Sequence, residues 1–176
     1  MKKALFLILL LVLLFVFASC SEKGINMFFK IYDNEKVADT TFYEKIDAIE
    51  QRNDSKIVMM FAKAIQNEKT LSQDAVRLID SIHGDITSIS SASDTGVNAN
   101  YEKNKGKKKK EIQSSFCITT AETKYYMAIK ECVIDDYDNN NEGVLSVYII
   151  KAEDWKEDCV YIGDGKWTPG ITIDGR

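Results

Sequence analysis

Three runs of β-branched and aromatic residues in the second half of the chain decide its fold. They are Ile112-Gln-Ser-Ser-Phe-Cys-Ile-Thr-Thr120, Tyr125-Tyr-Met-Ala-Ile-Lys-Glu-Cys-Val-Ile134 and Val144-Leu-Ser-Val-Tyr-Ile-Ile150. Phe116 and Ile118 stand two residues apart in the first run, and the second run repeats this spacing, which is typical of strands with one buried face. Because short polar segments separate the runs, we predict a meander of three antiparallel strands.

Three helices are predicted before the meander. The sequence Thr41-x-x-Glu44 fits a capping box at the start of the first helix, and Thr70-x-x-Gln73 fits another at the start of the third. Gly84 is placed to end the third helix. The apolar stripes of the three helices are Phe42, Ile46 and Ile49; Ile57, Val58, Phe61, Ala62 and Ile65; and Leu71, Ala75, Leu78, Ile79 and Ile82.

A weaker strand is predicted from Ile86 to Ser91, where small hydroxyl residues alternate with isoleucines. With the meander it gives an antiparallel sheet of about four strands, and one face of such a sheet must be covered by the helices. The sequence therefore predicts the α+β class, with three N-terminal helices on that sheet, as a single domain over residues 38–176. A further short strand is expected at Val160–Ile162, after a loop that follows Lys151.

The N-terminus has the features of a secretory leader. Two lysines precede an apolar run of 14 residues, which is short for a membrane span of about 20, and Ala18-Ser-Cys20 follows. This end looks like a bacterial lipobox, which implies cleavage after Ser19 and acyl chains such as palmitate on Cys20. Phe17 departs from the aliphatic residue usual there. An uncleaved anchor, or cleavage that leaves Cys20 as a thiol, is the alternative.

From this leader we expect residues 1–19 to be a signal peptide and residues 20–37 to be the lipidated N-terminus and tether. Acyl chains hold a protein on a membrane without a transmembrane helix. The expected location is the outward-facing, extracytoplasmic side of the cell membrane, with membrane lipid as the partner of Cys20.

The composition excludes several classes of protein. The chain has 176 residues, of which 45% are hydrophobic and 28% charged, as in ordinary globular proteins. Its net charge of −4 gives no overall field that would attract nucleic acid, so no nucleic-acid partner is expected. A single proline argues against a proline-rich stalk.

No catalytic or metal-binding residue is predicted. His83 is the one histidine, and its position near Gly84 indicates a helix end, where a cation suits the dipole. The loop Asp135–Glu142 has the oxygen donors that calcium takes, but Asn141 replaces the glycine and Val147 the glutamate of an EF-hand loop. A solvated hairpin loop is the favoured interpretation, with adventitious calcium second. No cofactor is expected.

Two further patterns have simpler explanations. Lys103, Lys105 and 107–110 form a basic cluster that fits either anionic headgroups and wall polymers or an ordinary solvated turn. No aromatic residues are interleaved with these lysines, so single-stranded nucleic acid is not indicated. Asp94-Thr-Gly96 has the triplet of aspartic proteases, whose chemistry needs a second such aspartate, and chance is the better account.

The sequence leaves open the roles of the remaining cysteines and of the aromatic residues. Cys117, Cys132 and Cys159 are interpreted first as free thiols and second as a bridge that involves Cys159. A tight turn near Glu122 would set Cys117 opposite about Met127, away from Cys132. The aromatic residues of the sheet and tail either line a cavity or pack in the core with a hydrated polar tip; these are Tyr125, Tyr126, Tyr148, Tyr161, Trp155 and Trp167.

The order of three helices, a strand and a meander resembles the nuclear transport factor two-like, or cystatin-like, fold. With the turn Ile82-His-Gly-Asp-Ile86, the resemblance extends from Thr41 to about Ile150 and implies a curved sheet with a cone-like cavity. The leader, the length and Pro169-Gly-Ile171 are similar to those of secreted bacterial lipoproteins of the domain of unknown function 5104 family. These resemblances imply a fold but no chemistry.

Two functions are therefore expected, in order. The first is a non-catalytic extracytoplasmic module that binds a ligand or a protein. The second is an isomerase or cyclase that uses an acid or base in the cone, for which Asp80, Glu44 and the tyrosines are candidates. A homodimer formed through the sheet is a third possibility, which exposed apolar area on the outer sheet face would support.

Overall fold

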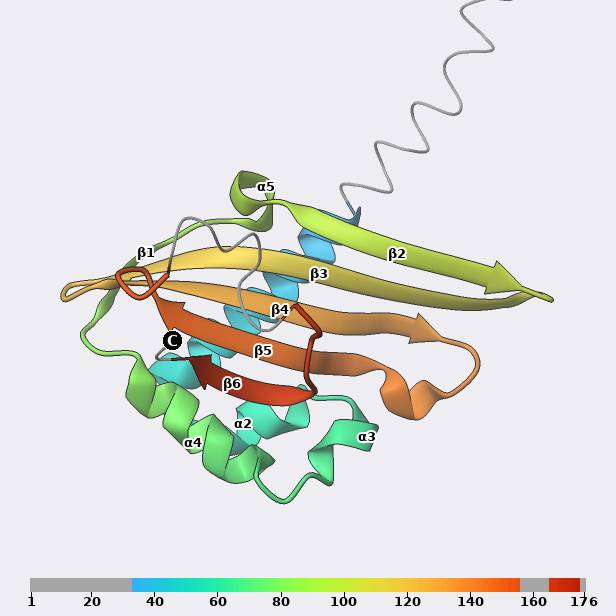
Figure 1. Ribbon diagram of the computed structural model, residues 1–176, viewed down its shortest axis with the longest axis horizontal. Helices are drawn as coiled ribbons and strands as arrows, with labels where there is room; N and C mark the ends of the chain where they lie inside the picture. Colours follow the sequence, from blue (N-terminus) through green and yellow to red (C-terminus); the bar gives the residue numbers. More distant parts are fainter. Residues whose placement is uncertain (1–32, 156–164, 175–176) are drawn as a thin grey trace, which may run out of the picture. The chain divides into compact units, whose positions relative to one another are not determined.

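The computed structural model describes residues 33–155 and 165–174. The chain divides into two compact units, Met1–Asn34 and Glu35–Arg176, and the second unit contains all the strands that the structure describes. Residues 35–50 lie in its first helix, which the structure describes from residue 33. Three shorter helices follow it, α2 (Asp54–Met59), α3 (Lys63–Gln66) and α4 (Leu71–Ser81) (Figure 1). The expected signal peptide, with Ser19 and Cys20, lies outside the described residues.

One sheet of six strands forms the rest of the unit. Its strands are β1 (Ile86–Ile89), β2 (Val97–Asn104), β3 (Lys107–Thr120), β4 (Lys124–Asp135), β5 (Gly143–Lys151) and β6 (Gly170–Asp174). A short helix, α5 (Ala92–Thr95), separates β1 from β2, and η1 (Asn139–Asn141) lies between β4 and β5. The strand order is β1-β3-β4-β5-β6, and β2 pairs with the first half of β3 on the same edge as β1. Among the strand pairs of the described residues, β5–β6 alone is parallel.

The three predicted strands are confirmed as β3, β4 and β5, and the unit is of the α+β class, but the predicted arrangement of helices and strands is wrong. The sheet is mixed and has six strands, and four described helical segments precede β1. The predicted arrangement had three helices and about four antiparallel strands. Polar β2 was missed because nearly all its side chains are exposed at an edge. The register was also wrong by one residue, since Cys117 lies opposite Tyr126.

The helix starts differ from the predicted capping boxes. Thr41 lies inside the first helix, and Thr70 precedes α4 without a side-chain cap bond. The second predicted helix is interrupted at residues 60–62, because its backbone pairs with β5 there. The Ala62 N–H donates to the Val144 carbonyl at 2.9 Å, and the Val144 N–H donates to the Met60 carbonyl at 3.0 Å. This tertiary pairing divides one predicted helix into α2 and α3.

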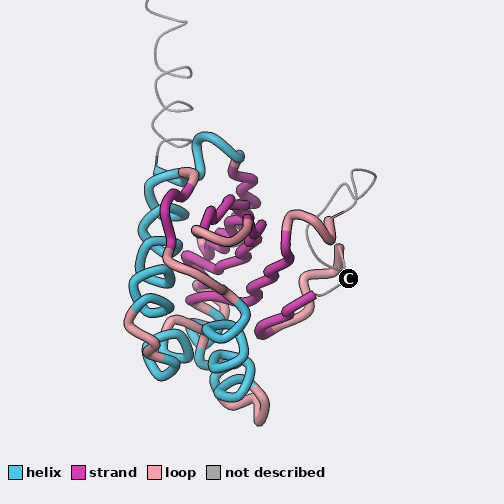
Figure 2. Tube along the Cα trace, turned by 90° about the vertical axis from the view of Figure 1, so that its left-hand side faces the viewer, coloured by secondary structure: helices cyan, strands magenta, loops and turns pink. Residues whose placement is uncertain are grey.

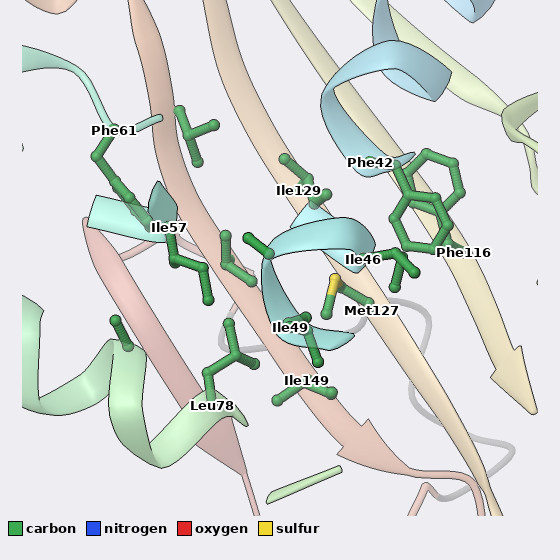
Figure 3. Packing of buried hydrophobic residues seen from close by; sticks show 14 of the residues in the cluster. Phe42, Ile46, Ile49, Ile57, Phe61, Leu78, Phe116, Met127, Ile129 and Ile149 are labelled. Atoms are coloured by element: carbon green, nitrogen blue, oxygen red, sulfur yellow. The ribbon is translucent and has the colours of Figure 1, made fainter. Parts of the chain in front are cut away.

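The helices cover one face of the sheet and fill the space against it. Figure 2 shows them together on one side of the strands. Phe42 stacks on Phe116 with ring centroids 3.8 Å apart, and both rings are fully buried. In Figure 3 the isoleucines of the first helix point toward Met127 and Ile149 of the strands. The opposite face, called the outer face below, carries the residues that alternate with these, such as Tyr126 and Ala128.

Candidate functional site

A buried polar cluster lies between the first helix and β4. Lys45 is 0% exposed and Glu131 is 6% exposed. The Thr41 hydroxyl donates to Oε2 of Glu131 at 2.6 Å. The other carboxylate oxygen and the Lys45 ammonium are buried and have no hydrogen-bond partner among the described residues. A lysine and a glutamate are thus held in the core with incomplete hydrogen bonding, which is costly.

Burial shifts the titration of both groups. It lowers the pKa of Lys45 to about 8, although the charges of Glu131 and Glu44 oppose this change. Burial also raises the pKa of the Glu131 carboxyl, against the hydrogen bond from Thr41 and the charge of Lys45. Displaced pKa values of this kind are found at functional sites and in structural ion networks alike.

The buried cluster has no described route for a substrate. None of the three described cavities is lined by Lys45, Glu131 or Thr41. The predicted acid candidates lie elsewhere: Glu44 is exposed, and Asp80 is exposed and pairs with Arg52. The cluster can hold protons, but its geometry is that of a polar contact within the core.

A groove of about 480 Å³ lies on the outer face of the sheet. Its aromatic lining is Tyr126 from β4 together with Trp155 and Trp167 from the segments that follow β5. These are the only two tryptophans of the chain. Asn98, Gln113 and Ser115 supply polar groups, and the remaining described lining residues are also uncharged. We call this site the outer-face groove.

The aromatic side chains are held by contacts with the sheet. The Trp155 ring stands edge-on to Tyr126 at 4.9 Å, and the Trp167 ring stands edge-on to Tyr148 at 5.7 Å. The Thr168 N–H donates to the Tyr148 hydroxyl at 2.6 Å. The segment that carries Trp167 is also fixed by β5, because the Ser146 hydroxyl donates to the Trp167 carbonyl at 2.9 Å. The groove therefore has positioned walls.

The Trp155 indole has an unsatisfied polar atom. Its Nε1–H is buried and donates to no acceptor among the described residues. Buried donors of this kind are rare in folded proteins, and each one calls for an explanation such as an acceptor that a ligand brings.

A larger hollow of about 570 Å³ opens on the helix side of the molecule. It lies between the end of the first helix and the turn after α4, and its lining includes Arg52, Asp85 and Gly84. The two tryptophans and the unsatisfied indole lie elsewhere. The outer-face groove is therefore the stronger candidate site.

The lysine cluster belongs to the hairpin of β2 and β3, which turns at Lys105 and Gly106. Lys109 forms an ion pair with Glu111 at 3.1 Å, and Lys130 contacts the other oxygen of Glu111 at 3.0 Å. Part of the cluster is thus neutralised by the sheet. Lys103, Lys105 and Lys108 are exposed.

The acidic loop after β4 forms its own hydrogen bonds. The Asp135 carboxylate accepts the backbone N–H groups of Tyr137 and Asp138, and its second oxygen accepts the Asn141 amide. Asp138 in turn accepts from Asn140. No group of three metal-ligating side chains is present in the described parts of the chain. The carboxylates organise the hairpin loop that the sequence favoured.

The other singled-out residues have structural roles. His83 is exposed beyond the end of α4, so the predicted helix-end role is not seen, and its backbone N–H donates to the Tyr125 hydroxyl. Asp94 accepts hydrogen bonds from the backbone and hydroxyl of Ser91, which lower the pKa of its carboxyl. Cys117 and Cys132 are free thiols, and burial raises the pKa of Cys132 to about 11. Cys159 lies outside the described residues.

Part of the buried cluster could have been recognised in the sequence. Lys45 falls within the apolar helical stripe between Phe42 and Ile49, and Glu131 continues the two-residue period of β4 after Ile129. The positions of Trp155 and Trp167 carry no periodic signal, because both lie in irregular segments.

Comparison with known proteins places the chain in a family. Among the described residues, no helix combines the length and the apolar character that a membrane crossing needs. Comparison with curated proteins gives no match. A family model described as Domain of unknown function (DUF5104) matches residues 44–152, which is more than half of the chain. The match begins within the first helix and covers α2 to α5 and all strands from β1 to β5. The chain belongs to the DUF5104 family.

Proposed function

We propose that the protein is a membrane-anchored, outward-facing bacterial lipoprotein whose domain binds a ligand in the outer-face groove without catalysing a reaction. The observation that carries the binding role is the groove itself, which is lined by both tryptophans and by uncharged polar side chains. Sites of this kind, mostly apolar with a few placed polar groups, are typical of ligand binding. The leader that ends at Ser19 and Cys20 supports the anchor.

An acid–base enzyme is the second candidate. Glu131 has the buried carboxyl with a raised pKa that such an enzyme needs, beside a lysine with a lowered pKa. However, the stacked rings of Phe42 and Phe116 and the surrounding isoleucines fill the space under the helices. A substrate would have to displace this packing. The binding role is therefore preferred.

Dimerisation through the sheet has less support. The large exposed apolar side chains lie on separate elements rather than on the outer face: Tyr43 on the first helix, Met59 on α2, Val76 on α4, Tyr101 on β2 and Tyr137 in the loop after β4. We also propose a nuclear transport factor two-like architecture for the domain. The support for it is the long first helix, which packs across an antiparallel meander.

Native mass spectrometry tests the binding role. The whole chain would be expressed with its leader and purified from membranes in a detergent without a sugar headgroup, and then exposed to a cell-envelope extract. We expect a small molecule to be retained at stoichiometric level and to be lost from Trp155→Ala. Tyr137→Ala is the control, because it removes an exposed aromatic residue outside the groove. A protein that retains nothing and has the mass of a dimer would refute the binding role.

Metabolic labelling tests the anchor. A palmitate analogue should label the parent protein and fail to label Cys20→Ala. Cys117→Ala is the matched control, because this thiol lies in β3 of the folded unit. Equal labelling of Cys20→Ala and the parent would show that Cys20 is not the acylated residue.

A further inference from the structure

The aromatic walls of the outer-face groove define the shape of its ligand. Tyr126, Trp155 and Trp167 present ring surfaces within one groove, and the edge-on contacts to tyrosines fix the orientation of both indoles. The face of an aromatic ring carries partial negative charge. It therefore packs well against C–H groups, which carry partial positive charge when their carbon bears oxygen. A ring-shaped ligand with an oxygen-rich rim fits such walls.

The polar lining defines the rim of the ligand. Asn98 and Gln113 are register partners on β2 and β3, so two side-chain amides stand next to each other at the groove. Each amide offers one acceptor and two donors. The described parts of the chain contain no hydrogen-bond partner for either side chain, and the groove also contains Ser115. Ligand hydroxyls, which donate and accept, match this set.

The charge of the groove lining limits the chemical class of the ligand. No Asp, Glu, Lys or Arg is among the described residues that line the groove, although exposed lysines stand further along the same two strands. An anionic ligand would be drawn to Lys103, Lys105 and Lys108 rather than to the groove. A neutral ligand matches the described lining, which offers no acidic or basic side chain to pair with a charged one.

Together these observations identify one ligand class, and the inference rests on the proposed binding function. We infer that the outer-face groove binds a neutral oligosaccharide, whose sugar rings stack on Trp155 and Trp167 and whose hydroxyls bond to Asn98 and Gln113. Sugar rings combine apolar C–H faces with uncharged hydroxyl rims, as the three previous features require. A groove of about 480 Å³ holds a short oligosaccharide rather than a large folded partner.

Tryptophan fluorescence gives a direct test, because both tryptophans of the chain line the groove. The whole chain, in a detergent without a sugar headgroup, would be titrated with cellohexaose, chitohexaose and maltohexaose. We expect a saturable change in emission with at least one of them, at a dissociation constant below about 1 mM. The constant should change less than about twofold when salt is raised, since the ligand carries no charge.

Variants assign the signal to the groove. Trp155→Ala should weaken binding at least about tenfold, with Trp167 as the remaining reporter. Gln113→Ala, a surface change that keeps both indoles, should weaken it about threefold or more. Gln73→Ala on α4 is the matched control and should bind like the parent. Equal affinities in Gln113→Ala and Gln73→Ala, or loss of binding in both, would overturn the assignment to the groove.

The outcomes also separate this inference from the proposed function. If none of the three oligosaccharides binds, or only an anionic one such as trigalacturonate does, the inference is wrong. The binding function would still stand if mass spectrometry found another retained molecule that Trp155→Ala loses. If no molecule of any class is retained, both the inference and the proposed function are wrong.

Discussion

The two faces of one sheet differ in how they use aromatic residues. On the helix side, Phe42 and Phe116 are fully buried and stacked on each other, and they fill the space between helix and strands. On the outer face, Trp155 and Trp167 stand edge-on to tyrosines and line a groove. The first arrangement stabilises the fold, and the second forms the groove in which we propose that a ligand binds.

The two faces also differ in where charge is placed. The helix side contains a buried lysine and glutamate, whereas the described lining of the outer-face groove is uncharged. Charge buried in a core costs stability, so the helix side gives up stability at Lys45 and Glu131 that apolar residues would supply. The comparison predicts that substitutions on the helix side change stability, while substitutions on the outer face change binding.

The largest expected loss of stability is at the stacked rings of Phe42 and Phe116. Phe42→Ala should lower the free energy of unfolding by about 3–5 kcal/mol, because it removes a buried ring and leaves a cavity. Urea denaturation measures the change. Tyr43→Ala, at the next position but 43% exposed, should cost under about 1 kcal/mol. Similar losses for the two variants would contradict the assignment of the core to this face.

The next largest effect is a dependence of the unfolding free energy on pH, which Lys45 causes. Its pKa is lower in the folded chain, about 8, than its ordinary value of 10.5, so the unfolded chain binds more protons between these pH values. The free energy of unfolding should therefore rise with pH across this interval, by roughly 3 kcal/mol from this one group. The raised pKa of Glu131 acts at lower pH, where stability should fall as pH rises through that pKa.

The double variant Lys45→Met/Glu131→Leu isolates this contribution. It should be as stable as the parent at pH 7 or more stable, because both buried charges are replaced by apolar groups. The unfolding free energy of the parent should rise relative to that of the double variant between pH 8 and 10.5. A constant difference over that interval would mean that Lys45 titrates as an ordinary exposed lysine.

A smaller effect is expected at Thr41. Thr41→Val keeps the side-chain shape but removes the hydroxyl that donates to Glu131 at 2.6 Å, so the buried carboxylate loses its only described hydrogen bond. The loss should be about 1–3 kcal/mol by thermal or urea unfolding. Thr40→Val is the neighbouring control, because the Thr40 hydroxyl bonds an exposed backbone carbonyl. Equal losses of stability in Thr41→Val and Thr40→Val would show that the buried hydrogen bond to Glu131 stabilises the fold no more than an exposed one.

The smallest effect on stability is expected on the outer face. Gln113→Ala should change the unfolding free energy by no more than about 0.5 kcal/mol, as is usual for partly exposed polar side chains. The same variant should lose affinity for the ligand of the groove. A large loss of stability would mean that the outer face also holds the fold together.

Local patterns in the sequence account for much of the fold. The period of two in β3 and β4 and the apolar stripe of α4 are strong because each element buries one face. They do not predict pairing between distant segments. The parallel contact of β6 with β5, and the pairing of residues 60–62 with Val144, depend on tertiary geometry that no short stretch specifies.

The candidate site was less predictable than the fold. Thr41 fits a capping box by spacing, but the helix already includes residues 33–40, so the hydroxyl is available to Glu131. The sequence indicates the tryptophans as aromatic surface, but the position of Trp167 over the outer face depends on the bonds that join residues 167 and 168 to β5. The bond that Ser146 donates and the bond that Tyr148 accepts cannot be inferred from local sequence.

The position of the tryptophans along the chain bears on how this protein can diversify. Trp155 and Trp167 lie beyond residue 152, where the family match ends, while the strands beneath them lie within it. The packing that holds the sheet is on the other face and does not involve these residues. The two indoles can therefore be replaced without rebuilding the core, whereas Ile171 and Ile173 of β6, in the same C-terminal segment, pack against it. We expect related chains to differ in the ligand that they bind more than in their stability.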